Sequence, residues 1–402
     1  MRQSILILTG ILFFLEFYIY LGFKSLFTSS TARNIYLLFT ASIYIFLLYH
    51  FFQFRSDEQN NHERVQVVAT VFLAFLLPKL LTGIILLIDD IIRAGQYLYS
   101  TTTPGDTYLP ERRKFLSGIG LGLAATLTLL ILDGVALGKY RHKVRRVKIR
   151  LPNLPEAFKG YRIVQISDMH AGSFLNPKKL ESAFKLINKQ NADLIVFTGD
   201  MVNNKATELL PLQHLFRSLK AKDGKFSVLG NHDYGQYVEW RSEKEKDQNL
   251  LDLISYKEDA GFVTLRNQHV TIRRDGQTLH LVGVENWGEK PFPQYGDLDK
   301  ATKGLEVDSA KVLLSHDPTH FDQIVKHHPS KIGLTLSGHT HGMQFGLDLK
   351  NIKWSPVQYR YKKWVDLYES AGSYLYVNRG FGVIGYPGRV GMHPEITEIE
   401  LI

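Results

Sequence analysis

Two aspartates, one asparagine and four histidines stand in five short motifs that together could bind metal ions. The motifs are Asp168-Met169-His170, Gly199-Asp200, Gly230-Asn231-His232-Asp233, Ser315-His316-Asp317 and Gly338-His339-Thr340-His341. The candidate ligands are Asp168, His170, Asp200, Asn231, His316, His339 and His341. Carboxylate, amide and imidazole groups without a thiolate suit Mn²⁺, Fe or Zn²⁺, and this set is too large for one tetrahedral ion. We therefore expect two divalent cations, with Mn²⁺ as the first choice of metal and Asp200 as the bridging carboxylate.

Each motif follows a short apolar run that predicts a buried strand. The runs span residues 161–166, 194–197, 226–229, 312–314 and 332–336. Gly or Ser marks the point where each run ends. Ligands of α/β sheets bind at the carboxyl ends of strands, so we expect the five motifs to converge on one point.

Helical segments between these strands predict parallel strands with helices outside the sheet. Pro177 begins a helix that Asn191 ends, and residues 209–219 form a second helix. Residues 249–260 form a third helix, after the charged run 241–248, which suits either a solvated helix face or a loop.

The second half of the chain predicts a mixed, partly antiparallel sheet. Asp275-Gly276 is a two-residue hairpin turn between closely spaced strands. Strands in addition to those before the motifs are expected at residues 147–151, 262–265, 270–272, 279–284, 373–377 and 396–402.

The first third of the chain contains four apolar stretches long enough to span a membrane. They cover residues 5–23, 35–54, 65–88 and 115–137. We expect a transmembrane domain over residues 1–138 and a second domain over residues 139–402. Glu16, Lys79 and Asp133 interrupt the stretches, and charges inside a bilayer are costly enough to suggest function. Snorkelling towards the interface is the alternative, and the role of each charge stays open.

The charge of the chain fits contact with membrane lipids better than contact with nucleic acid. The net charge is +9, but Lys and Arg are either dispersed or placed beside the apolar stretches. We therefore expect no nucleic-acid partner. The chain has no Cys, which excludes disulfides and thiol chemistry.

Two signals disagree on the side of the membrane that holds the second domain. The basic run 139–150 after the fourth stretch favours the cytoplasmic side. Arg112-Arg113, followed by Lys114-Phe115-Leu116, resembles a twin-arginine export signal, although an ordinary basic anchor is the alternative. Residues 147–151 alternate as in a half-buried strand, so the basic residues there belong partly to a folded domain. We expect a multi-pass protein of the cell membrane with an extracytoplasmic second domain.

The five motifs, in this order, resemble the calcineurin-like metallophosphoesterase superfamily and its membrane-anchored branch. The resemblance covers roughly residues 145–402. It implies an α/β domain, more closely an α+β four-layer sandwich of two mixed β-sheets flanked by helices, after the four transmembrane helices. It also implies that Asp168, His170, Asp200 and His341 hold one metal. The other metal would be held by Asp200, Asn231, His316 and His339.

The resemblance further implies a metal-dependent phosphoric ester hydrolase. A hydroxide shared by the two cations would attack phosphorus in a phosphomonoester, phosphodiester or pyrophosphate. His232 would be the catalytic histidine, a non-ligand that Asp233 or another acid orients. A phosphorylated small molecule or a lipid-linked compound is the expected substrate. The alternative is a catalytically inactive binding module of this fold with a function in its membrane domain, and the oligomeric state stays open.

Some residues depart from the family pattern or lie outside it. Asp233 stands where many members have Glu, and Gly342-Met343-Gln344 replaces the usual second Gly, so we expect both to affect substrate fit. Substrate contact is one hypothesis for Arg379, Arg389 and Trp287. We favour a surface or packing role for each of them.

Overall fold

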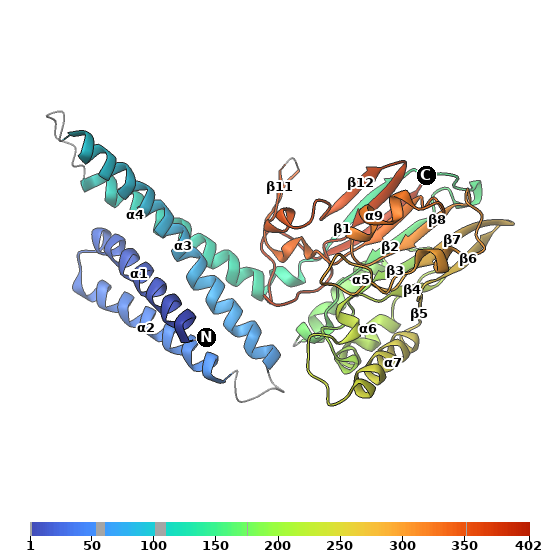
Figure 1. Cartoon of the computed structure of the whole chain (residues 1–402), viewed down its shortest axis with the longest axis horizontal. Coiled ribbons are helices and arrows are strands. Elements are labelled where there is room, and N and C mark those ends of the chain that lie inside the picture. Colours follow the sequence, from blue (N-terminus) through green and yellow to red (C-terminus); the bar gives the residue numbers. More distant parts are fainter. Residues whose placement is uncertain (1, 54–60, 101–109, 175, 351) are drawn as a thin grey trace. The chain divides into compact units, whose positions relative to one another are not determined.

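The computed structural model describes residues 2–53, 61–100, 110–174, 176–350 and 352–402, and the chain divides into two compact units (Figure 1). One unit comprises Met1–Ala136 together with Gly385–Pro387. The other comprises Leu137–Ile384 and Gly388–Ile402.

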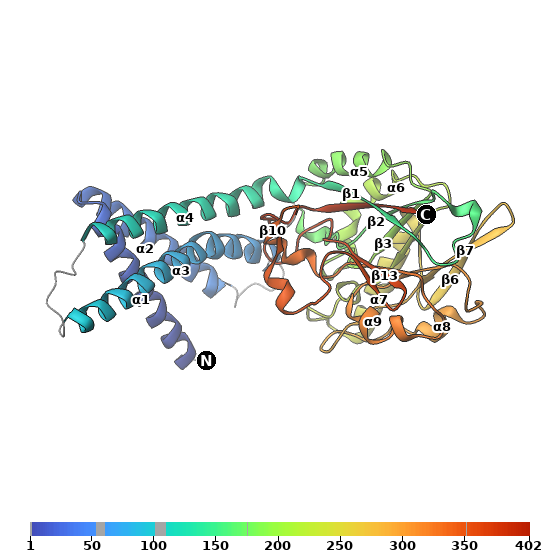
Figure 2. The same cartoon turned by 90° about the horizontal axis from the view of Figure 1, so that it is seen from above.

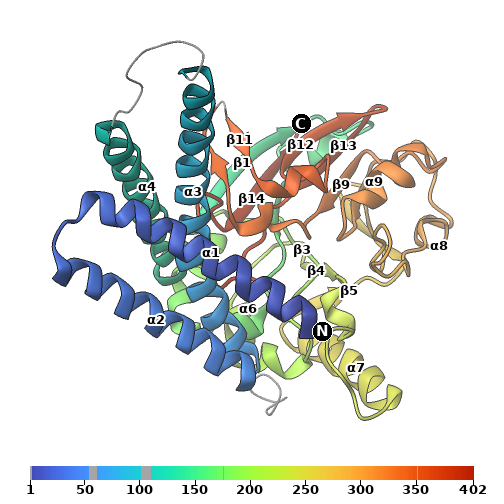
Figure 3. The same ribbon diagram turned by 60° about the vertical axis from the view of Figure 1, so that its left-hand side comes forward.

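The first unit is built from four helices in its described part. Its helices are α1 (Arg2–Leu26), α2 (Ser30–Gln53), α3 (Asn61–Ser100) and α4 (Pro110–Ala136). The pair α1 and α2 runs antiparallel, as Figure 3 shows. Among the described residues, three segments are long and apolar enough to cross a membrane, at Ser30–His50, Arg64–Tyr99 and Glu111–Ala136. These contain most of the last three expected spans, α1 carries the first, and Phe54 of the second lies outside the described residues.

Two of the charges that interrupt the apolar stretches compensate each other. Lys79 Nζ lies 2.5 Å from Glu16 Oε2, and the hydroxyl of Tyr36 donates to Glu16 Oε1 at 2.5 Å. Lys79 also lies over the ring of Phe75, at 3.6 Å from its centroid. Pairing of this kind lowers the cost of placing an ammonium and a carboxylate among apolar helices.

The second unit is built on two six-stranded sheets in the part of the chain that the structure describes. In the first sheet the order is β1 (Lys143–Ile149), β14 (Glu395–Leu401), β2 (Arg162–Ile166), β3 (Leu194–Thr198), β4 (Lys225–Val228) and β5 (Phe262–Thr264). In the second sheet it is β12 (Asp366–Ser370), β13 (Ser373–Val377), β9 (Leu334–Ser337), β8 (Lys311–Leu314), β7 (Gln277–Gly283) and β6 (Gln268–Arg274). Both sheets mix parallel and antiparallel pairs.

Alternation of side chains along the strands places apolar groups on both faces of each sheet. Val196 of β3 belongs to the same buried cluster as Leu281 of β7 and Leu314 of β8, so the inner faces of the two sheets pack against each other. Phe197, one residue after Val196, points to the opposite face and joins a cluster with Phe216.

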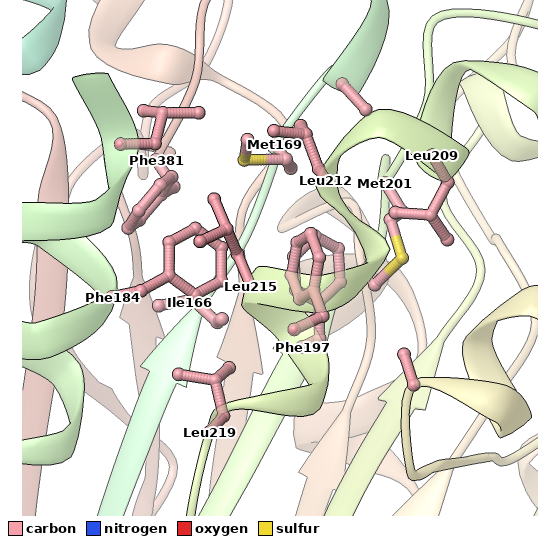
Figure 4. Packing of buried hydrophobic residues seen from close by; sticks show 14 of the residues in the cluster. Ile166, Met169, Phe184, Phe197, Met201, Leu209, Leu212, Leu215, Leu219 and Phe381 are labelled. Atoms are coloured by element: carbon pink, nitrogen blue, oxygen red, sulfur yellow. The ribbon is translucent and has the colours of Figure 1, made fainter. Parts of the chain in front are cut away.

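Helices cover the outer faces of the sheets. Over the first sheet lie α5 (Glu181–Asn188) and α6 (Gln213–Arg217), and Figure 4 shows Phe184, Leu215 and Phe197 in that layer. The outer face of the second sheet packs against α8 (Leu298–Thr302) and α9 (Thr319–Gln323). Figure 2 shows these helices on the two sides of the strands. The expected sandwich of two mixed sheets flanked by helices is confirmed.

Several helices and one strand differ from their expected bounds. The segment expected as a helix at 209–219 is a 3-10 segment, Ala206–Leu212, followed by the short α6, because Pro211 lacks the N–H that an α-helix needs. A 3-10 turn, Pro177–Leu180, likewise precedes α5.

The helix expected at 249–260 begins earlier, and so does the opening strand. Helix α7 (Glu243–Asp259) starts within the charged run because the hydroxyl of Ser242 accepts from the N–H of Glu245 and caps it. Strand β1 starts at Lys143, four residues before its expected beginning, and pairs with β14. The two-residue turn between β6 and β7 is where it was expected.

Candidate metal centre

The five motifs lie at the carboxyl ends of five strands from both sheets. Asp168 and His170 follow β2, Asp200 follows β3, and Asn231 and His232 follow β4. The motif with His316 follows β8, and the motif with His339 and His341 follows β9. Because β2, β3 and β4 run parallel, as do β8 and β9, their carboxyl ends share one edge of each sheet.

Asp168, His170 and His341 form the first group of converging ligand atoms. One ligand atom from each lies within 4.8 Å of the others, and all three residues are buried. The Nε2 atoms of His170 and His341 are 3.0 Å apart, and His341 Nε2 lies 3.3 Å from Asp168 Oδ1. Nitrogen lone pairs and a carboxylate that point at one place form a suitable cation site.

Asp200, His316 and His339 form the second group, which also fits within 4.8 Å. His316 Nε2 lies 3.1 Å from Asp200 Oδ2 and 3.2 Å from His339 Nδ1. The same carboxylate oxygen lies 3.6 Å from His170 Nε2 in the first group. Asp200 therefore reaches both groups, as a bridging ligand must.

Asn231 offers a further ligand to this centre. Its side-chain N–H donates to the hydroxyl of Tyr237 at 2.8 Å. Its Oδ1 atom is buried and has no hydrogen-bond partner among the described residues. A buried acceptor without a partner is costly, and a cation would satisfy it.

Hydrogen bonds from outside the centre set which histidine nitrogen faces inwards. His316 Nδ1 lies 2.7 Å from the carbonyl oxygen of Thr198, which can only accept, so Nδ1 carries a proton and Nε2 is the nitrogen that faces the centre. His339 Nε2 lies 2.8 Å from the hydroxyl of Tyr361, which leaves its Nδ1 atom facing His316. The donor set thus fits divalent cations.

Burial and mutual charge shift the pKa values of these groups. Burial opposes ionisation of Asp200, but His316 and neighbouring histidines outweigh it and lower the pKa of this carboxyl. Burial likewise disfavours a charged His316, but Asp200 outweighs it and raises the pKa of that imidazole to about 10. Because a ligand nitrogen must be free of its proton, metal binding has to displace a proton from this pair.

The turns that carry the ligands are strained. Asp168, His170, Asp200, His339 and His341 all have positive φ, between 48° and 72°. Residues other than glycine seldom adopt this region, and such outliers gather at functional sites.

Glycine is required beside two of the ligands. A Cβ on Gly338 would lie 2.2 Å from Asp168 Oδ2, and one on Gly230 would lie 2.2 Å from Asp200 Oδ1. These glycines let the backbone approach the carboxylates closely.

His232 stands beside the two groups without joining either. Its ring centroid is 4.9 Å from that of His170 and 4.4 Å from that of Tyr237. Its Nδ1 atom donates to the carbonyl oxygen of Asn203 at 2.8 Å, so Nε2 is the nitrogen that remains available for proton transfer. Its backbone N–H donates to Asp200 Oδ1 at 2.8 Å.

Asp233 does not orient His232, contrary to expectation. It is fully buried and accepts from the backbone N–H groups of four residues, at 2.8 to 3.3 Å. These residues are Asp200, Met201, Val202 and Gly230. The carboxylate of Asp233 therefore holds the loop after β3 against the loop after β4, while a backbone carbonyl orients His232.

Two tyrosines of the centre were not found from the sequence. Tyr237 covers His232 and bonds Asn231, and Tyr361 bonds His339. Neither belongs to a motif, and Tyr361 follows the last one by 20 residues, so only the folded chain reveals their place.

The arginines considered as substrate contacts have structural roles instead. Arg379 is fully buried and pairs with Asp366 and Glu395, each at 2.7 Å. Arg389 is buried and donates to backbone carbonyls, among them that of Gly382 at 2.6 Å. Trp287 lies against His320, with ring centroids 5.2 Å apart.

Gln344, in the sequence that departs from the family pattern, ties its loop to a neighbouring loop. Its amide donates to the carbonyl oxygen of Gly388 at 3.1 Å and accepts from the N–H of Ile384 at 2.6 Å. Gly342 and Met343 before it both have positive φ. With this sequence in the loop, His341 remains in the first group of ligands.

Comparison with known proteins identifies two matching regions. Residues 1–139 match a family model described as the transmembrane domain of a probable calcineurin-like phosphoesterase. Residues 161–343 match the model of the calcineurin-like phosphoesterases.

Similar proteins are found in bacteria and animals. An uncharacterised metallophosphoesterase of Bacillus subtilis, YkuE, is 30% identical over 72% of this chain and 97% of its own length. A zebrafish transmembrane protein with a metallophosphoesterase domain is 30% identical over 64% of this chain, which spans only 57% of that relative. The UDP-2,3-diacylglucosamine pyrophosphatase LpxG of Chlamydia trachomatis is 27% identical over 57% of this chain and 80% of its own length.

Proposed function

Because the chain belongs to the calcineurin-like phosphoesterase family, we propose that this membrane protein, a metal-dependent phosphoric ester hydrolase, cleaves a phosphoester or pyrophosphate bond of a lipid-linked substrate. The observation that carries the proposal is the meeting of two ligand groups at Asp200, with His232 beside them.

Two divalent cations are assigned to the centre. Asp168, His170, Asp200 and His341 hold one of them, and Asp200, Asn231, His316 and His339 hold the other. When bound, the cations supply Lewis-acid activation of the phosphoryl group and of a water nucleophile. Mn²⁺ is the proposed metal, since the donors are oxygen and imidazole nitrogen without thiolate, and Fe and Zn²⁺ are the alternatives.

His232 is assigned to the leaving group. Its Nδ1 proton is held by the carbonyl oxygen of Asn203, so a proton on Nε2 is the one that the ring can deliver. Delivery of that proton to the leaving oxygen, or a hydrogen bond to the charge that develops there, lowers the barrier to cleavage.

A lipid-linked substrate is supported by the apolar helices and by one relative. The helices of the first unit put the hydrolase next to a bilayer, and LpxG is named for a pyrophosphatase activity on a diacylated nucleotide sugar. A phosphorylated small molecule is the alternative substrate.

We place the phosphoesterase domain on the extracytoplasmic side. The basic run after α4 would otherwise argue for the cytoplasm, but two of its members form ion pairs within the domain. Arg146 pairs with Glu398 at 2.9 Å and Lys148 pairs with Glu400 at 3.0 Å, across β1 and β14. Because these residues belong to a strand of the domain, and domains translocate largely regardless of charge, the run carries little weight for topology.

The test uses the full-length protein in detergent, with bis(4-nitrophenyl) phosphate and Mn²⁺, Fe²⁺ or Zn²⁺. Wild type is expected to release 4-nitrophenol, and Asp200→Asn and His232→Ala are expected to lose most of that rate. His214→Ala is the matched control, because His214 is exposed on α6. Absence of turnover in wild type with every metal would favour the catalytically inactive binding module.

A further inference from the structure

A pocket of about 610 Å³ adjoins the second group of ligands. Tyr361 lines it, and the hydroxyl of Tyr361 lies 2.8 Å from His339 Nε2. Thr319 lines it as well, and its hydroxyl donates at 2.7 Å to Asp317, whose other oxygen lies 3.4 Å from His339 Nε2. The wall of the pocket is therefore one side chain away from a candidate metal ligand.

The pocket carries an excess of positive charge. Four basic and two acidic side chains line it, which leaves two positive charges uncompensated. The basic residues are Lys326, Arg360, Lys362 and Lys363, and the acidic residues are Glu289 and Asp322. An excess of positive charge in a recess attracts an anion.

The other three basic side chains of the pocket form ion pairs, which leaves Lys362 available to bind an anion. Asp322 is shared by Lys363 and by Lys326, the latter at 3.0 Å. Arg360 pairs with Glu289 at 2.9 Å. Lys362 is exposed, and no ion pair joins it to another residue in the described ranges.

Neutral donors complete the lining. Tyr361 lines the pocket, and its hydroxyl supplies a neutral O–H donor. The guanidinium of Arg360 lies 5.5 Å from the centroid of the Tyr361 ring. Guanidinium, ammonium and hydroxyl groups around one recess are the donor set that phosphate oxygens use.

We propose that this pocket binds a second phosphate of the substrate, distinct from the phosphate that is cleaved, an inference that rests on the proposed function. A phosphate dianion matches the two uncompensated charges, and the volume accommodates it together with part of the group to which it is attached. The enzyme would then select a compound with at least two phosphates, such as a diphosphate, over a simple phosphodiester.

Charge reversal of Lys362 is the direct test. The full-length protein is compared as wild type, as Lys362→Glu and as Lys244→Glu, a matched control whose lysine is exposed on α7 and does not line the pocket. Binding of radiolabelled ADP and inhibition by ADP of bis(4-nitrophenyl) phosphate hydrolysis are both measured, with the metal in excess over ADP. Lys362→Glu should weaken ADP binding and inhibition by ADP by about fivefold or more, because the attraction between Lys362 and a phosphate becomes a repulsion. Lys244→Glu should weaken neither.

A second arm separates the two sources of a diphosphate. Diacylglycerol pyrophosphate in mixed micelles replaces ADP as the competitor. Loss of inhibition in Lys362→Glu with the lipid alone assigns the pocket to a lipid head group, and loss with ADP alone assigns it to a nucleotide.

A result that contradicts the second-phosphate role of the pocket would leave the proposed function intact. Wild type and both variants would then hydrolyse bis(4-nitrophenyl) phosphate, and neither competitor would distinguish Lys362→Glu from Lys244→Glu. Conversely, ADP binding that depends on Lys362, in a protein without turnover of the diester with any metal, would support the pocket and contradict the proposed function.

Discussion

The Nε2 atoms of His170 and His341 lie 3.0 Å apart, although 171 residues separate the two histidines along the chain. Two neutral imidazoles that meet nitrogen to nitrogen need a proton or a cation between them. Asp168 lies 3.3 Å from the same atom of His341, and His170 Nδ1 has no partner among the described residues to fix its proton. A cation satisfies both nitrogens and the carboxylate at once.

Removal of His341 should empty one of the two cation positions. His341→Ala deletes a nitrogen ligand from the first group but leaves the second group, with Asp200, His316 and His339, intact. We expect the metal content of the purified protein to fall from about two ions per chain to about one. Elemental analysis by mass spectrometry measures it, with His214→Ala as the control. Two retained ions would contradict the ligand assignment.

Removal of the His232 ring should slow cleavage most for poor leaving groups. The alanine variant keeps the backbone N–H that donates to Asp200, so metal content should not change. Loss of a general acid costs about 10²- to 10⁴-fold in kcat, and less when the leaving group needs no proton.

A series of aryl and alkyl phosphodiesters provides the measurement for His232. In His232→Ala, the logarithm of kcat should depend more steeply on the pKa of the leaving alcohol than in wild type. An equal fall for every ester would make His232 a positioning residue instead.

Much of the fold was predictable because local patterns agreed with the tertiary structure. The apolar runs before the motifs are β2, β3, β4, β8 and β9, and the glycine or serine after each run marks a real strand end. Pro211 shows the limit, since the apolar period of residues 209–219 predicted one helix where a missing N–H divides the segment.

The organisation of the centre was predictable only in part. Residue types suggested two cations and the place of Asp200 between them, because carboxylates bridge and strand ends converge. The roles of Asp233, Tyr237 and Tyr361 depend on loops that meet only after folding, and no spacing in the sequence encodes them. For Asp233 the hypothesis of a contact with His232 was wrong, since four backbone N–H groups compete for its carboxylate.

Replacement of Asp233 should therefore weaken the fold as well as the activity. Asp233→Ala leaves four buried backbone N–H groups without their acceptor and removes the tie between the loops after β3 and β4. We expect a loss of roughly 3 to 5 kcal/mol in the free energy of unfolding. Asp233→Asn keeps one acceptor oxygen, so its free energy of unfolding should lie between those of wild type and Asp233→Ala. Thermal unfolding of the full-length protein in detergent checks the order, and equal midpoints for all three would refute it.

The ion cluster around Arg379 should make stability depend on pH in the acid range. Burial opposes ionisation of Asp366, but two hydrogen bonds at 2.7 Å and the charge of Arg379 outweigh it and lower the pKa to about 2. The unfolded chain has a pKa of about 3.9 for Asp, so it takes up the proton first as pH falls. The contribution of Asp366 is therefore complete above about pH 5 and lost between about pH 4 and 2. It amounts to roughly 2 kcal/mol.

Denaturant unfolding at pH 3 and pH 7 measures this contribution. Asp366→Asn should reduce the free energy of unfolding at pH 7 by more than at pH 3. Asp308→Asn is the control, because Asp308 is exposed and, among the described residues, its ion pair is with the exposed Lys331. A loss that is the same at both pH values would exclude Asp366 as the titrating group.

The pair Arg112-Arg113 should act as a clamp between α3 and α4, which favours the basic-anchor hypothesis over the export signal. Arg112 Nε lies 2.9 Å from Asp89 Oδ1, and Arg113 Nη1 lies 2.7 Å from Asp90 Oδ1. The side chain of Asp89 is only 1% exposed. Arg93 contacts both aspartates from the next turn of α3. Double replacement by glutamine leaves Asp89 buried with less compensation, which costs several kcal/mol, whereas double replacement by lysine keeps the charges.

A reporter that is active only outside the cytoplasm, fused to the C-terminus, separates the two hypotheses. A clamp predicts that the double lysine variant keeps its reporter activity and its amount in the membrane, and that the double glutamine variant falls in both. A twin-arginine signal depends on the arginines themselves, not on their charge, so it predicts loss of reporter activity already in the lysine variant. Replacement of Asp89 and Asp90 by asparagine supplies the complementary test, because it removes the acidic half of the clamp and leaves both arginines unchanged. If the clamp holds the helices together, this variant should lose membrane protein as the glutamine variant does.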